Sequence, residues 1–165
     1  MQEFLNHLIA AMREELQQYG EMLARLDEQQ ELVIHRVSKD LPASVDAVQT
    51  QSAVIEATRR QREQTQRQTA VALGLPAEST LGQISQSAPA NYRPLVEALV
   101  QENNELLFRV QQRARQNHLL LSRSLELMKN LVESLLPGNP NPTYNEEGQR
   151  LGQALRTRSF YEAVC

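Results

Sequence analysis

Apolar residues that recur at helical spacing over most of the chain are the feature that most constrains its fold. From Phe4 to Val37 they follow one another at steps of three, four or seven residues, which keeps them on one face of a helix. The row consists of Phe4, Leu8, Met12, Leu16, Tyr19, Leu23, Leu26, Val33 and Val37. It predicts a first long helix over about residues 3–38, which ends before Pro42 because a proline disfavours helical backbone in the residue that precedes it.

Three further helices are predicted. The second covers about 43–73, and its half at 58–69, TRRQREQTQRQT, has almost no apolar residues, so it is either a solvated helix or a stretch that awaits a partner. A short helix over about 80–87 follows the capping residues Ser79 and Thr80. The third long helix covers about 94–136, with an apolar row from Leu95 to Leu135 that averages close to 3.6 residues per step.

The composition agrees with long helices packed along seams, since aromatic residues are only 4% and Trp is absent. We therefore expect an all-α fold: three long antiparallel helices in an elongated coiled-coil-like bundle over residues 1–137, with a short connecting helix. Residues 138–165 form a Pro- and Asn-rich strap and an extended C-terminal tail. The first and third long helices should run the same way, and the third should project past its neighbours.

Catalytic, cofactor and metal sites are not expected. His7, His35 and His118 stand far apart, without a second ligand at metal-binding helical spacing, and no glycine-rich phosphate loop is present. The single cysteine, Cys165, has no histidine near it in sequence that could activate it. We expect a protein that is not an enzyme.

The charge and hydropathy of the chain limit its partners. A net charge of −3 gives no overall attraction to nucleic acid, and the cluster Arg59, Arg60, Arg62 and Arg67 contains no aromatic residue to stack on bases. No segment approaches the roughly 20 apolar residues of a membrane span, and the N-terminus lacks a secretory signal. The chain is expected to be a cytoplasmic protein that neither binds nucleic acid nor inserts into a membrane.

The apolar stripe of the third long helix widens near its end. Leu121, Leu125, Met128 and Val132 continue the seam, while Leu120, Leu127 and Leu131 form a second row about 100° around the helix. A helix that contacts two neighbours needs such a width, which is the structural interpretation. The alternative is a partner-binding surface, because the second row occurs where the neighbouring helices should end and the strap PGNPNPTYNEEG begins. Tyr144 in this strap would be an efficient anchor.

Two stretches resemble the FlgN family of bacterial flagellar export chaperones. RQNHLLLSRSLELMKNLVESLLP followed by TYNEEG resembles the closing part of the family, and ALGLPAESTLGQI, residues 72–84, is similar to a connection between its helices. The resemblance implies a cytoplasmic chaperone that holds hook-filament junction (hook-associated) proteins soluble and delivers them to the membrane export gate of the flagellar type III system.

Carried over position by position, the resemblance and the second apolar row give the candidate partner-binding residues. They are Asn117, Leu120, Leu121, Leu125, Leu127, Met128 and Leu131 on the helix, and Thr143, Tyr144, Asn145 and Gly148 in the strap. The tail after Gly148 departs from shorter family members. The competing hypothesis is a self-associating coiled-coil adaptor whose apolar rows close a homodimer.

Overall fold

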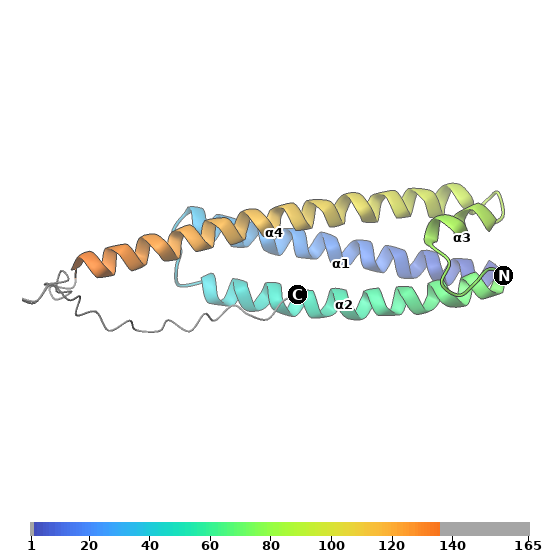
Figure 1. The fold of residues 1–165 in the computed structure, drawn as a ribbon, viewed down its shortest axis with the longest axis horizontal. Helices are drawn as coiled ribbons and strands as arrows, with labels where there is room; N and C mark the ends of the chain where they lie inside the picture. Colours follow the sequence, from blue (N-terminus) through green and yellow to red (C-terminus); the bar gives the residue numbers. More distant parts are fainter. Residues whose placement is uncertain (1, 136–165) are drawn as a thin grey trace, which may run out of the picture. The chain divides into compact units, whose positions relative to one another are not determined.

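The structure, a computed structural model, describes residues 2–135 and divides into a first unit that ends at Leu125 and a second that begins at Glu126. It contains α1 (Gln2–Ile34), α2 (Leu41–Ala72), α3 (Leu81–Ser87) and α4 (Arg93–Leu135) (Figure 1). No strand occurs in the range 2–135, and the predicted all-α fold is confirmed. The strap and tail at 138–165 lie outside the described residues.

Two asparagines of α4 define how this helix packs on α1. The Asn103 Nδ2 donates to the Met12 carbonyl at 3.2 Å, and the Asn117 Nδ2 donates to the Leu26 carbonyl at 2.6 Å. The sequence separation is 91 residues in both contacts, so α1 and α4 run parallel in one constant register. The predicted direction of these two helices is therefore correct.

Eight of the ten side chains that α1 buries follow a heptad pattern, in which steps of three and four residues alternate with the 3.5-residue period of coiled coils. The row is Leu5, Leu8, Met12, Glu15, Tyr19, Met22, Leu26 and Gln29. Ile9 and Gln18 are buried as well, next to this row. Leu16 and Leu23, which the prediction placed in the row, are only half-buried, and Glu15 and Met22 occupy the inward positions instead.

The predicted row of α4 needs a similar correction. Leu95 and Ala114 are exposed, whereas Val96 is buried and pairs in register with Leu5. The inward positions between Leu99 and Asn117 include the polar residues Asn103 and Arg113, which contact α1 through hydrogen bonds and an ion pair. The predicted row was wrong at these positions because it followed an average step of 3.6 residues, whereas the inward positions follow the 3.5-residue period of a coiled coil.

Helix α2 runs antiparallel to α1. The Thr69 hydroxyl donates to the Phe4 carbonyl at 3.2 Å, and the Gln51 Nε2 donates to the Gln18 carbonyl at 3.1 Å, so numbers fall along α1 as they rise along α2. The stretch 58–69 is part of this continuous helix. Thr65 and Thr69 are buried, so this stretch faces the bundle with polar rather than apolar side chains.

The apolar core lies where α3 joins the three long helices. Leu5, Leu8, Ile9 and Met12 of α1 meet residues of the other helices and of the turn after α3, namely Ala70, Ile84, Ala88, Val96 and Leu99. Helix α3 starts at Thr80 with a capping box: the Thr80 hydroxyl accepts from the Gln83 backbone N–H, and the Gln83 side chain accepts from the Thr80 N–H. Thr80 confirms the predicted capping position.

Left-handed residues end α1 and α2. Arg36 has φ 56, and the backbone N–H groups of Arg36 and Val37 donate to Val33 and Leu32, the pattern of a Schellman motif. Gly74 has φ 76 and follows α2 with the same pair of bonds, from Gly74 to Val71 and from Leu75 to Ala70. Helix α1 thus ends at Ile34, before the predicted residue 38.

The two motifs give a paired prediction on stability. Arg36→Gly should raise the free energy of unfolding by up to about 1 kcal/mol, because glycine adopts a positive φ without the steric penalty of a Cβ atom. Gly74→Ala should lower it by about 1 kcal/mol for the same reason. Urea denaturation followed by circular dichroism measures both. An equal decrease in the free energy of unfolding of the two variants would contradict this explanation of the Arg36 conformation.

Candidate partner-binding surface

The predicted helix residues of the first unit differ in their exposure. Asn117 is only 1% exposed, and its Nδ2 also donates to the Gln29 Oε1 at 3.1 Å, in addition to its contact with Leu26. Leu120 and Leu121 are half-buried, while Leu125 is 65% exposed. Asn117 is therefore a bundle contact and does not belong to an exposed surface.

The helical residues of the second unit form an amphipathic segment. At 100° per residue Leu127, Met128, Leu131 and Val132 cover one arc, and Glu126, Lys129, Asn130 and Glu133 cover the opposite arc. Lys129 and Glu133 form an ion pair of 3.9 Å on the polar side. The apolar side is open: Leu127 is 69% and Leu131 is 57% exposed, and every described side chain from residue 122 to 134 is exposed.

The register of the first unit explains which part of α4 finds partners on α1. A separation of 91 residues places Ile34, the last residue of α1, level with Leu125.

Leu119 is an exposed leucine that the sequence reasoning omitted from the site. It belongs to the run Leu119–Leu121 and is exposed, but helical geometry places it about 100° around α4 from Leu120 and about 160° from Leu121. The leucine run itself was the signal, although only its last two residues share the candidate face. The strap residues Thr143, Tyr144, Asn145 and Gly148 lie outside the described residues.

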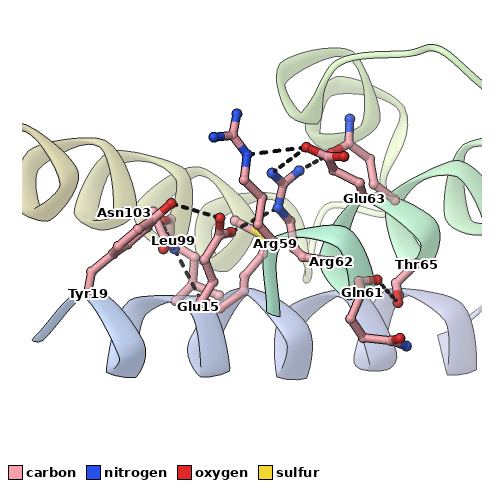
Figure 2. A network of polar contacts seen from close by, with 11 residues as sticks. Glu15, Tyr19, Arg59, Gln61, Arg62, Glu63, Thr65, Leu99 and Asn103 are labelled. Carbon is pink, nitrogen blue, oxygen red and sulfur yellow. Dashed lines mark hydrogen bonds and ion pairs between the residues drawn. The ribbon is translucent and has the colours of Figure 1, made fainter. Parts of the chain in front are cut away.

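A buried network of polar side chains joins α1 to α2 (Figure 2). The Glu15 carboxylate accepts from the Tyr19 hydroxyl and from the Arg62 Nε, each at 2.9 Å, and both partners of the ion pair are largely buried. The Arg62 Nη1 donates to Gln66, whose Nε2 donates to the Ser79 carbonyl at 2.8 Å. The carboxylate is thus engaged by α1 and α2, and its geometry suits holding α2 in place.

The arginine cluster at 59–67 is largely paired with carboxylates. Arg59 contacts Glu63 at 3.3 Å, Arg60 contacts Glu56 at 3.2 Å, and Arg62 reaches Glu15 across the bundle. These pairs reduce the positive potential that phosphate binding would need.

Comparison with protein families identifies the chain. The family model for FlgN protein matches residues 1–152, a range that contains all four helices and the strap residues. The chain belongs to the FlgN family.

FlgN is a family of flagellar export chaperones, which is not an enzyme family. No curated protein and no solved structure matches the chain. Among the helices at 2–135, none has the length and apolar content that crossing a membrane requires. The candidate partner-binding residues that the structure describes and finds exposed in this FlgN-family chain are Leu125, Leu127, Met128 and Leu131 of α4.

Asn117 provides a test that separates bundle packing from partner binding. Asn117→Asp keeps the shape but replaces the donor with an acceptor that faces the Leu26 carbonyl and Gln29. We expect a loss of about 2–4 kcal/mol in the free energy of unfolding, since a charge is left buried without a partner. Asn117→Leu should stay folded, and thermal unfolding of the two variants checks both expectations. A folded Asn117→Asp protein of wild-type stability would contradict the packing role.

The network gives a prediction on pH dependence. Burial, then the charge of the nearby Glu15 carboxylate and the hydrogen bond to it, raise the pKa of Tyr19 from 10.0 to about 12. The folded protein therefore retains a proton that the unfolded chain releases, and this contribution is complete below pH 10 and is lost as the pH rises toward 12. The free energy of unfolding of the wild type should fall by up to about 2–3 kcal/mol more than that of Tyr19→Phe over this interval. Urea titrations at a series of alkaline pH values measure the difference, and parallel curves would refute it.

Proposed function

We propose that this member of the FlgN family is a cytoplasmic export chaperone for flagellar hook-associated proteins. It binds them through the C-terminal part of α4, with Leu120, Leu121 and Leu125, and with Leu127, Met128 and Leu131. In this proposal it keeps these clients soluble and delivers them to the membrane export gate of the flagellar type III apparatus.

The open apolar side of α4 is the observation that carries the proposal. Burying a leucine side chain releases about 1.5–3 kcal/mol, so exposing several on one arc is costly unless another polypeptide covers them. An amphipathic segment of the client fits this arc by laying its own apolar face along the leucines. Met128 suits such a surface, because its unbranched thioether side chain adapts to differently shaped partners.

The strap residues complete the proposed surface. Thr143, Tyr144, Asn145 and Gly148 follow the helix in sequence, and the resemblance assigns them to the same partner-binding region. A tyrosine combines a large apolar ring with one hydroxyl, which suits an anchor in an interface or at the export gate. An extended interface of this kind has moderate affinity, which permits release of the client.

Substitutions of exposed leucines of α4 test the proposal. Leu127→Glu and Leu131→Glu should each weaken client binding at least about tenfold, since each removes a buried leucine and places a charge in the interface. The matched control is Leu119→Glu, at an equally exposed leucine outside the candidate residues, which should bind the client within about threefold of the wild type. Calorimetry with a purified hook-associated protein measures affinity, and circular dichroism verifies unchanged helicity.

Two outcomes would count against the proposal. Loss of folding in Leu127→Glu or Leu131→Glu would show that these residues are core, and equal binding by all three variants would place the client elsewhere. Self-association through the same apolar side is the competing function. Sedimentation over a concentration series distinguishes it, because a tight homodimer that Leu131→Glu dissociates would leave this side closed to a client.

A further inference from the structure

A groove between α3 and α4 of the first unit is unrelated to the leucine surface. It is a largely open hollow with a volume of about 400 Å³. Its lining is Gly82, Ser85 and Gln86 from α3, and Glu97, Val100, Gln101, Asn104 and Glu105 from α4. Two of these eight residues are carboxylates, and the nearby cation Arg93 donates through its Nη2 to the Gln86 carbonyl at 2.7 Å.

Gly82 is a glycine that the fold itself does not require. It lies inside α3 with helical backbone, where glycine is less favourable than alanine by up to about 1 kcal/mol. A Cβ atom built at this position would meet only the Thr80 Oγ1, at 3.9 Å, which is an ordinary contact. The chain therefore leaves room for a side chain at this position, which lines the groove.

The groove has a carboxylate near each end, Glu97 and Glu105, and an exposed phenylalanine follows on α4. Glu97 is held in place by the Ser85 hydroxyl, which donates to its Oε1 at 3.1 Å, and Glu105 accepts from Gln101 at 2.8 Å. Eight residues of helix separate the two carboxylates, or about 12 Å along the axis. Phe108, one turn after Asn104 on the same side of α4, is 66% exposed.

We propose that this groove is a second docking site, which binds a short, extended, basic segment of a partner protein. An extended chain is narrower than an α-helix, which is about 10–12 Å across with its side chains, and can approach the backbone at Gly82 closely. Two basic side chains four residues apart in an extended chain are about 13 Å apart, which matches the spacing of Glu97 and Glu105. An apolar side chain next to them packs on Phe108.

This proposal does not depend on client binding by the leucines of α4, so an experiment can contradict one proposal and leave the other standing. The groove would recognise its partner by positive charge, whereas the leucines would recognise an amphipathic helix. Binding should weaken as salt is added, because the contacts with Glu97 and Glu105 are exposed and screened.

The test uses the full chain and two pools of short fluorescein-labelled peptides. One pool has arginines at two positions four residues apart in a neutral background with one phenylalanine, and the other has glutamates at the same positions. Fluorescence anisotropy should show tighter binding of the arginine pool by at least about tenfold, with a steep dependence on salt. Equal binding of the two pools would overturn the proposal.

Variants of the groove complete the test. Gly82→Leu fills the groove and should weaken binding of the arginine pool at least about tenfold, whereas the matched control Gly82→Ala should change it less than about threefold. The pair Glu97→Gln and Glu105→Gln keeps the hydrogen-bond acceptors and removes the charges, so it should also weaken binding and reduce the salt dependence. These exposed positions answer the question even if Gly82→Leu fails to fold. Unchanged binding in the charge variants, or in Gly82→Leu with intact helicity, would place the peptide elsewhere.

Discussion

Hydrogen bonds from Asn103 and Asn117 to backbone carbonyls of α1 fix the register on which the rest of the bundle depends. A carbonyl of an α-helix retains a second lone pair after its helical bond, so a side-chain amide at an inward position can bind it. The two asparagines lie two heptads apart, which ties α1 to α4 at two points and disfavours a slip by one turn. Leucines in their place would pack well but would not select one register over the next.

This register also determines where along α4 the apolar core lies and where contact with α1 ends. It brings the apolar ends of α1 and α4 together at Leu5 and Val96, where Ala70 and Ile84 complete the core. It places the other end of α1 level with Leu125, the last residue of the first unit. About seven turns of α4 separate Leu99 in the core from Leu125. Substitutions at the C-terminal part of the helix therefore leave the core packing intact.

Much of the fold could be predicted from apolar periodicity, but the inward polar residues could not. The existence and order of the long helices followed from the apolar rows and from Pro42. The rows themselves were partly displaced, because Leu16 and Leu23 were preferred to Glu15 and Met22. A buried glutamate is recognised only once its partners Arg62 and Tyr19 are known to face it.

The polar side of α2 shows the same limit. Residues 58–69 have almost no apolar side chain, yet Thr65 and Thr69 are buried because their hydroxyls bind backbone carbonyls, including that of Phe4. In the sequence the only signal is a heptad spacing of Thr58, Arg62, Thr65 and Thr69, which a search for apolar residues ignores. The end of α1 was misplaced for a similar reason, since an arginine at a positive φ gives no glycine signal at position 36.

For the candidate surface, sequence reasoning identified the leucines but not their separation from the bundle contacts. Asn117 was grouped with the leucines in the sequence, and only its contacts show that α1 covers it. In the first unit the Nδ2 donors of Asn103 and Asn117 are engaged by α1, whereas in the second unit Leu127, Met128 and Leu131 are exposed. A partner that covers the open part needs apolar side chains more than hydrogen-bond acceptors, because the donors of Asn117 are already engaged. The first unit thus fixes a register through polar contacts, while the second unit keeps its apolar side chains exposed.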